Sequence, residues 1–122
     1  MSDLKAIAEK LVEYCKTQQE DKALAELYDP AIVSVEAASM PGMSREASGM
    51  DAIKGKHAWW NENFEVHGGS VTGPFLHADD RFAVIFELDA TNKASGERSE
   101  MKEVALYTVG GDGKIVREEF FY

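Results

Sequence analysis

The chain has few of the residues that form disulfides or cross membranes. Cys15 is its single cysteine, so it cannot form an internal disulfide, which suits a reducing compartment. The apolar runs are a few residues long, far short of the ~20 needed to cross a bilayer. The first residues, Met-Ser-Asp-Leu-Lys, do not resemble a signal peptide. We therefore expect a soluble cytoplasmic protein with no membrane partner.

Positive charge is also scarce. Lys and Arg total 13 against 22 Asp and Glu, a net charge of −9, which would repel the phosphate backbone of a nucleic acid. The sequence contains no phosphate-binding loop, nucleophile elbow or metal-binding motif. His57, His67 and His77 are spaced by ten, which no metal site requires. We expect no nucleic-acid partner, no cofactor and no metal.

The strongest pattern that is present lies at the end of the chain, from Ser99 to Tyr122. Residues 101–109 and 115–122 are rich in β-formers, and the turn formers Gly110-Gly111-Asp112-Gly113 separate them, which predicts an antiparallel hairpin. The last three residues are Phe-Phe-Tyr. Because three aromatics exposed together would lower solubility, we expect this strand to be central or well covered.

Helical periodicity dominates the first half of the chain. It predicts helices over residues 3 to about 18, with Asp3 as a cap, over 22–28, and over 49 to about 64. In the third helix Ile53, His57, Trp60 and Phe64 form one stripe. Residues 31–37 alternate as a strand, and 39–48 lack a period, which indicates a mobile loop that borders a pocket mouth.

From Glu65 onward the pattern is that of strands. We expect strands over 65–72, bent by a bulge at Gly68-Gly69, over 75–77 and over 81–91. The last of these carries five alternating apolar residues and should be a core strand. Together these elements predict a single α+β domain, residues 1–122, with three N-terminal helices on one face of a curved sheet and a cavity at its open end.

Three stretches resemble the SnoaL-like proteins of the nuclear transport factor 2-like superfamily. They are Leu27-Tyr28-Asp29-Pro30, Gly49-Met50-Asp51-Ala52-Ile53-Lys54, and Gly111-Asp112-Gly113-Lys114-Ile115-Val116. The resemblance implies a cone-shaped fold of about six mostly antiparallel strands, with a pocket between the helices and the concave sheet face. It also implies frequent dimerisation through the convex face. It implies no single function, because the superfamily includes isomerases, cyclases, dehydratases and transport adaptors.

Among the enzymes of this superfamily, ketosteroid isomerase has a carboxylate base on its first strand, and a gapless match places that position on Glu36. The same match places the isomerase's oxyanion-binding residues on Val12 and Ala105, and Tyr14 lies on another side of the helix from Val12. Steroid isomerisation itself is therefore not expected. SnoaL-like cyclases use a carboxylate and a histidine, for which Glu36 and His57 are a loose equivalent.

The candidate site residues follow from this resemblance and from strand alternation. Either Ile32, Ser34 and Glu36 face the pocket, where burial would raise the pKa of a carboxyl group, or Val33, Val35 and Ala37 do and Glu36 faces water. No Lys or Arg is an obvious partner for Glu36, since Lys54 and Lys56 lie off the packed stripe. The catalytic candidates are Glu36 as base, His57 and Glu103. The ligand-binding candidates are Tyr14, Trp60, Phe86, Tyr107, Glu118, Phe120 and Tyr122.

Several of these residues have a purely structural alternative. Glu103 and Glu118 could lie in solvent or pair with Lys102, Lys114 or Arg117, and we expect that for at least one of them. His57 could be a core histidine. Trp59 could line the pocket mouth or a dimer contact, and Cys15 should be packed in the core.

Two functional classes therefore remain. One is a cofactor-free acid-base enzyme of the isomerase, cyclase or dehydratase type, acting on a small, mostly apolar carbonyl compound. The other is a non-catalytic domain that binds a small ligand or another protein. In either case we expect a homodimer through the convex face of the sheet, where Ala83, Ile85, Val104 and Leu106 are apolar.

Overall fold

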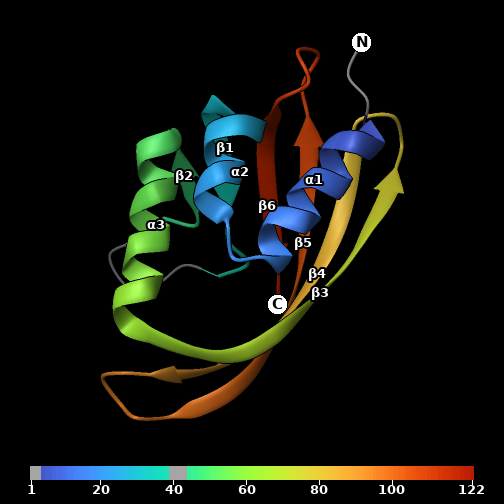
Figure 1. Ribbon diagram of the computed structural model, residues 1–122. Coiled ribbons are helices and arrows are strands. Elements are labelled where there is room, and N and C mark those ends of the chain that lie inside the picture. Colours follow the sequence, from blue (N-terminus) through green and yellow to red (C-terminus); the bar gives the residue numbers. More distant parts are fainter. Residues whose placement is uncertain (1–3, 39–43) are drawn as a thin grey trace.

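The computed structural model describes residues 4–38 and 44–122 (Figure 1). These residues form three helices and six strands of one curved, open, mixed sheet, so the chain has the α+β class expected from its sequence. The helices are α1 (Leu4–Lys16), α2 (Glu20–Leu27) and α3 (Met50–Asn63). The strands are β1 (Tyr28–Val35), β2 (Glu46–Ser48), β3 (Phe64–His77), β4 (Arg81–Asn92), β5 (Arg98–Val109) and β6 (Ile115–Phe121).

The order of the strands, β2-β1-β6-β5-β4-β3, determines which residues meet at one end of the sheet. Strand β1 runs parallel to β6, so both strands end at the same end of the sheet, while β5 runs antiparallel to β6 and extends beyond it. Glu36 directly follows β1, Tyr122 directly follows β6, and Glu103 lies in the middle of β5, next to Val104, which pairs with the last residue of β6. This topology therefore brings three distant parts of the sequence together.

The core lies between the inner face of the sheet and the helices, which Figure 1 shows gathered on one side of it. Helix α1 contacts β3 and β4, α2 contacts α1 and β1, and α3 contacts β1, β2 and β3. The fully buried side chains include Leu11, Leu24, Ile32, Ile53, Phe82, Val84 and Ile115. Ile32 and Ser34 on β1, and Phe82 and Val84 on β4, are buried at alternate positions, so each of these two strands buries one face.

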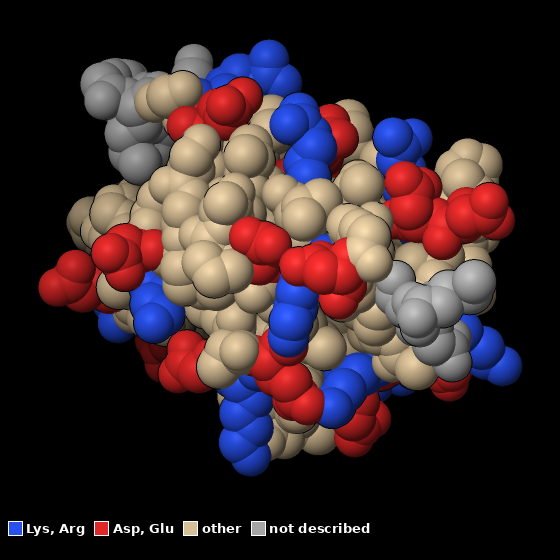
Figure 2. All heavy atoms as spheres, turned by 90° about the horizontal axis from the view of Figure 1, so that it is seen from above, with Lys and Arg blue, Asp and Glu red and all other residues tan. Residues whose placement is uncertain are grey.

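The surface carries both signs of charge. Figure 2, seen from above, shows acidic and basic side chains interspersed around an area of other residues, with no continuous basic surface on this face. Among the described residues no helix is long and apolar enough to span a membrane.

The region between the first strand and the third helix differs from the expected loop. Residues 39–43, like the expected cap Asp3, lie outside the described residues. Residues 46–48, however, form β2 and pair antiparallel with β1, in the register Val33 to Ser48. Three residues are too few to show a period of two, so the sequence could not reveal this strand. Strand β1 also begins three residues earlier than expected, at Tyr28.

Strand β3 is continuous over the two segments that were expected to be separate. Its pairing with β4 shifts register between Val66 and Gly68 and again between Thr72 and Phe75, so the first bulge falls next to the expected Gly68-Gly69 position. Gly69 is needed there, because an added Cβ would lie 2.2 Å from the backbone oxygen of Glu87. At Gly68 the same atom would meet nothing within 4 Å.

The terminal hairpin forms as expected, and β6 is an interior strand. Gly113, with φ +81°, is the residue of the turn that needs a left-handed backbone. Strand β6 is therefore central, as expected, but its last aromatic residue and the one that follows it are not covered, since Phe121 and Tyr122 are 52% and 64% exposed. Phe121 pairs with Val104 on the outer face, which no helix of the described chain covers, and Tyr122 lies beyond the last strand.

Candidate active site

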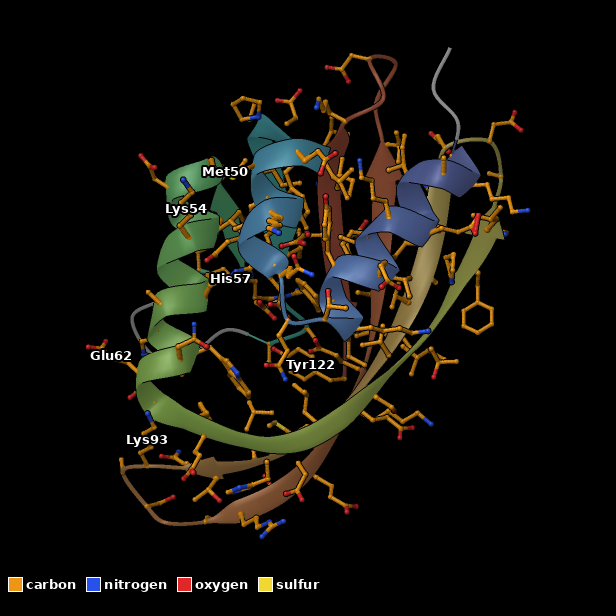
Figure 3. All side chains as sticks on the ribbon, viewed as in Figure 1. Met50, Lys54, His57, Glu62, Lys93 and Tyr122 are labelled. Atoms are coloured by element: carbon orange, nitrogen blue, oxygen red, sulfur yellow. The ribbon has the colours of Figure 1, made fainter. Side chains whose placement is uncertain are left out.

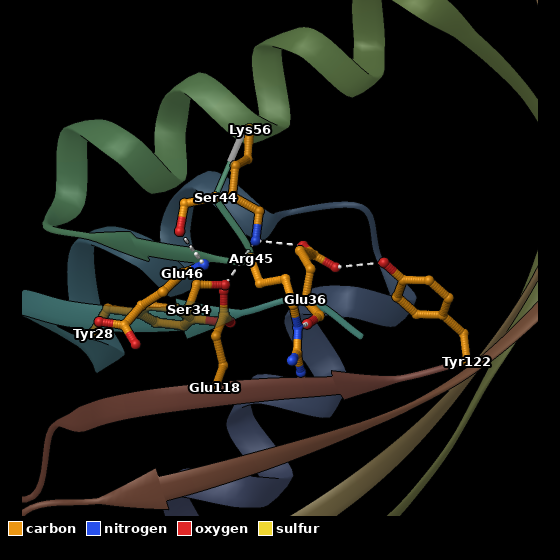
Figure 4. Close-up of polar contacts among 9 residues, drawn as sticks. All are labelled: Tyr28, Ser34, Glu36, Ser44, Arg45, Glu46, Lys56, Glu118 and Tyr122. Carbon is orange, nitrogen blue, oxygen red and sulfur yellow. Dashed lines mark hydrogen bonds and ion pairs between the residues drawn. The ribbon is translucent and has the colours of Figure 1, made fainter. Parts of the chain in front are cut away.

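Glu36, Glu103 and Glu118 lie on the inner side of the sheet where β1, β6 and β5 run side by side, and Figure 4 shows two of them, Glu36 and Glu118. Ile32 and Ser34 are fully buried, so the face of β1 that leads to Glu36 is the inner one. Ser34 pairs with Glu118 of β6, and Glu118 pairs with Tyr107 of β5, which lies on the same face as Glu103, two alternations further along the strand. Glu36, Glu103 and Glu118 are thus brought close together by adjacent strands.

Glu36 is held at both of its carboxylate oxygens. Lys56 Nζ lies 2.5 Å from Oε1, and the Tyr122 hydroxyl donates to Oε2 at 3.3 Å. The sequence expectation that Glu36 has no cationic partner is therefore wrong. Lys56 follows the buried Ile53 by three positions, and this spacing turns its side chain toward the sheet rather than away from it.

Lys56 also ties α3 to β1 through a buried hydroxyl. Its ammonium donates to Ser34 Oγ at 2.7 Å and lies 5.2 Å from the ring centre of Phe120. The side chains of Lys56 and Glu36 are 24% and 29% exposed, so the ion pair is partly screened from water. One lysine therefore links Ser34, Glu36 and an aromatic ring.

Glu103 differs from Glu36 in that, among residues 4–38 and 44–122, no hydrogen bond or ion pair holds its carboxylate. Burial raises its pKa to about 7, and the charges of Glu36 and Glu118 add to this rise while Lys56 opposes it. Phe86 of β4 is its partner across the sheet and provides an apolar wall. A carboxyl group in this state can both accept and return a proton near neutral pH.

Glu118 is the most deeply buried charged residue of the site. Its Oε2 accepts a hydrogen bond of 2.6 Å from the hydroxyl of Tyr28. Burial, followed by the charge of Glu118, raises the pKa of both Tyr28 and Tyr107 well above the usual value for tyrosine. Both tyrosines are therefore neutral, and Tyr28 is the donor that satisfies the buried carboxylate.

The expectation that Glu103 or Glu118 pairs with a cation or lies in solvent is wrong for both. Lys102 pairs with Glu87, Arg117 with Glu119, and Lys114 donates to the backbone oxygen of Glu26. Strand alternation explains this. Lys102 is adjacent to Glu103 and Arg117 is adjacent to Glu118, so the two cations point to the outer face of the sheet while the two glutamates point to the inner face.

The aromatic candidates surround this cluster in part. Phe86 and Phe120 lie on the inner face, and Trp60 stacks on Phe64 with ring centres 4.2 Å apart at the end of α3. Tyr107 stacks on Phe82 at 4.9 Å. Trp59 is exposed, and Cys15, whose thiol pKa burial raises to about 12, packs against the core.

Two candidates lie elsewhere. The Tyr14 hydroxyl donates to Glu26 across the α1–α2 hairpin, close to Lys10. His57 lines a surface groove of about 420 Å³ between α2 and α3, with Asp21, Leu24, Ala25, Lys54, Ala58 and Asn61 (Figure 3). Lys56, and not His57, is thus the α3 residue that contacts Glu36.

A second hollow, of about 290 Å³, lies beside Leu4, Asp79, Asp80 and Val109. Neither this hollow nor the α2–α3 groove is bordered by Glu36, Glu103 or Glu118, so the pocket predicted against the concave sheet face remains a prediction. In the described part of the chain, no group of three or more His, Cys, Asp or Glu residues could hold a metal ion.

The site residues missed at the sequence level are Lys56, Ser34 and Tyr28. For Lys56 the signal was available, since positions 53, 56, 57 and 60 share one face of a helix. Nothing local marks Tyr28 as the partner of Glu118, because the two are 90 positions apart.

Comparison with known proteins agrees with this architecture. A model of the SnoaL-like domain matches residues 3–122. A Mesorhizobium loti protein, provisionally named both a SnoaL-like polyketide cyclase and a carbohydrate phosphatase, is 42% identical over 98% of this chain and 99% of its own, with a TM-score of 0.91. No curated protein matches the sequence.

More distant structures share the fold alone. A Mycobacterium tuberculosis protein in complex with estradiol-17β-hemisuccinate is 18% identical over 100% of this chain and 95% of its own, with a TM-score of 0.69. A Catenulispora acidiphila protein with a ketosteroid isomerase-like fold, in complex with trimethylamine, is 15% identical over 95% and 84%, also with a TM-score of 0.69. Because the domain model matches almost the whole chain and the Mesorhizobium loti protein is 42% identical to it, the chain belongs to the SnoaL-like family, which has the nuclear transport factor 2-like fold.

Proposed function

We propose that the protein is a cofactor-free acid-base enzyme that acts on a small, mostly apolar carbonyl compound, with Glu103 as its base. The observation that carries this proposal is the state of Glu103. Its carboxyl group has a pKa of about 7, raised first by burial, and it stands beside the Glu36–Lys56 pair without a partner of its own in the described chain. A base with a pKa close to the working pH transfers protons most effectively.

This proposal moves the base from Glu36 to Glu103. Glu36 is engaged by Lys56 at one oxygen and by Tyr122 at the other, so each oxygen already has one partner. Proton abstraction by Glu36 would have to compete with these two contacts. Glu103 has no such competition, and burial, together with the negative charges of Glu36 and Glu118, keeps its proton affinity high although Lys56 opposes this.

The chemistry needs a substrate with an acidic C–H bond next to a carbonyl group. Isomerisation, aldol-type cyclisation and dehydration can all begin by removing such a proton. Phe86, which pairs with Glu103, and Phe120, which lies beside Lys56, support an apolar substrate, since aromatic rings offer large apolar surface. The polyketide cyclase name of the close relative and the steroid ester in a distant one agree with this class.

Proton abstraction can be tested without knowing the natural substrate. Cyclohexanone, acetophenone and 2-tetralone would be incubated with the protein in D₂O, and deuterium uptake next to the carbonyl followed by mass spectrometry. We expect faster uptake for at least one ketone, with loss of the acceleration in Glu103→Gln. Glu100→Gln, on the exposed part of the same strand, should retain it.

The outcome also separates the two functional classes. If no ketone exchanges faster than in buffer, while one of them binds in an NMR titration and perturbs the signals of Phe86 or Phe120, the non-catalytic ligand-binding class replaces the enzyme. Acceleration that survives Glu103→Gln would instead remove Glu103 from the mechanism.

The outer face of the sheet supports a homodimer as part of the same proposal. Ile85 pairs with Val104, which pairs with Phe121, and Phe75 pairs with Ala83, which pairs with Leu106, so six apolar side chains form two adjacent rows. Phe75 and Phe121 are 49% and 52% exposed in the single chain. Light scattering should give twice the chain mass at micromolar concentration, and Leu106→Glu should halve it. A wild-type mass of one chain would contradict the dimer.

A further inference from the structure

The ammonium group of Lys56 has more N–H donors than it has acceptors in the described part of the chain. An ammonium group has three N–H donors, and two of them have acceptors here, Ser34 Oγ at 2.7 Å and Glu36 Oε1 at 2.5 Å. In the described part of the chain these are the acceptors that the ammonium contacts. The Phe120 ring, centred 5.2 Å away, cannot accept a conventional hydrogen bond. One N–H of the ammonium thus has no acceptor among residues 4–38 and 44–122.

The ammonium is held in place by its partners rather than by its own flexible stem. Ser34 is fully buried on β1, and Glu36 is fixed by Tyr122 as well as by Lys56. A donor with a fixed position gives more stabilisation to a developing charge than a mobile one, because it does not have to reorganise during the reaction.

We propose that Lys56 is a catalytic residue, the group that stabilises the negative oxygen formed when Glu103 removes a proton from the substrate. This inference rests on the proposed function. The positive charge of Lys56 is needed for this role because the match to ketosteroid isomerase places Val12 and Ala105 where that enzyme has the residues that donate to the oxyanion. Tyr122 is a weaker candidate, since its hydroxyl already donates to Glu36 and its side chain is largely exposed.

The step balances within the protein and substrate. The Glu103 carboxylate takes the proton from the carbon next to the carbonyl, and the electrons of the broken C–H bond form a C=C bond. The carbonyl π electrons move to oxygen, giving an enolate whose charge lies against the third N–H of Lys56. Glu103 then returns the proton to another carbon or to the oxygen, and no oxidant, reductant or co-reactant is consumed.

The proposal can be tested with 4-nitrophenol, whose ionised form mimics an enolate oxygen on an sp² carbon and absorbs visible light. The wild-type protein should bind the phenolate more tightly than the phenol, seen as an increase in visible absorbance at a fixed pH below the free probe's pKa. Lys56→Met should lower the affinity for phenolate at least tenfold. Lys56→Arg keeps a positive charge and should bind phenolate with an affinity between those of Lys56→Met and the wild type. Lys54→Met removes an exposed lysine of the same helix and should bind like the wild type.

Removing Lys56 alone leaves the Glu36 charge unpaired and could unfold the protein. The double variant Lys56→Met with Glu36→Gln removes both charges together and keeps the test available if the single variant does not fold. With any ketone that exchanges, Lys56→Met should lower kcat by about 10²–10³, the range seen when one oxyanion donor is lost, and change KM little.

Two results would overturn the role of Lys56. One is equal phenolate binding by Lys56→Met and the wild type, and the other is a wild type that binds only the neutral phenol or neither form. Exchange that is lost in Glu103→Gln but unchanged in Lys56→Met would remove this inference and leave the proposed function standing. Absence of exchange with every ketone, together with Lys56-dependent phenolate binding, would remove the proposed function and leave an anion-binding lysine.

Discussion

Replacing Glu103 by glutamine should stabilise the protein above neutral pH and leave it nearly unchanged at pH 4.5. The pKa of Glu103 rises from 4.5 to about 7 in the folded protein, chiefly through burial. Between these values the folded chain holds a proton that the unfolded chain has released, so the free energy of unfolding falls as pH rises. This contribution is fully present below pH 4.5 and is lost by about pH 7.

The size of the effect follows from the width of that interval. Each pH unit changes the free energy of unfolding by about 1.4 kcal/mol, which gives at most about 3 kcal/mol over the whole interval. Water penetration and the coupling to Glu36 and Glu118 reduce this, so we expect about 1–3 kcal/mol at pH 8. Glutamine has nearly the same shape and no charge, so Glu103→Gln should gain this amount over the wild type.

Urea unfolding of both proteins at pH 4.5, 6, 7 and 8, followed by tryptophan fluorescence, measures this difference directly. The curves of the two proteins should meet at pH 4.5 and separate as pH rises. Glu100→Gln, on the exposed part of β5, is the control and should follow the wild type. A Glu103→Gln variant that is equally or less stable than the wild type at pH 8 would refute the argument that burial controls this carboxyl group.

Two further predictions concern packing. Gly69→Ala should lower stability by about 1–3 kcal/mol in urea unfolding, since its Cβ would clash with the Glu87 backbone, whereas Gly68→Ala should cost nothing. Equal stability of the two variants would contradict the close approach at Gly69. The thiol of Cys15, with a pKa of about 12, should react with Ellman's reagent at pH 8 only after unfolding, and fast labelling of the folded protein would contradict its burial.

Periodicity predicted most of the fold because it reports which face of each element is apolar. The alternation of Phe82, Val84 and Phe86 predicted a core strand, and the turn around Gly113 predicted the terminal hairpin. Both the strand and the hairpin lie where expected. Strand β2 was missed because three residues show no period. The interior position of β6 was predicted, but the exposure of Phe121 and Tyr122 was not, because composition says how apolar a segment is but not which side of the sheet lacks a covering layer.

The site was harder to predict, since its contacts join residues far apart in the sequence. Glu36, Glu103 and Glu118 could be selected as carboxylates among apolar neighbours, but strand alternation alone could not decide which face of β1 points inward. Which of the three is free depends on partners that sequence does not reveal, Lys56 for Glu36 and Tyr28 for Glu118. The choice of base therefore changed from Glu36 to Glu103 only when these contacts were known.

The central claim, that Glu103 is the carboxyl group poised to exchange a proton near neutral pH, is tested most directly by NMR. The protein would be labelled with ¹³C at the glutamate side-chain carboxyl carbon, and each resonance followed from pH 3 to 9. We predict one resonance that titrates near pH 7, is missing in Glu103→Gln and is still present in Glu36→Gln, where it titrates at a lower pH because the charge of Glu36 is lost. Titration of the Glu103 resonance near pH 4.5, as for an exposed glutamate, would contradict the account.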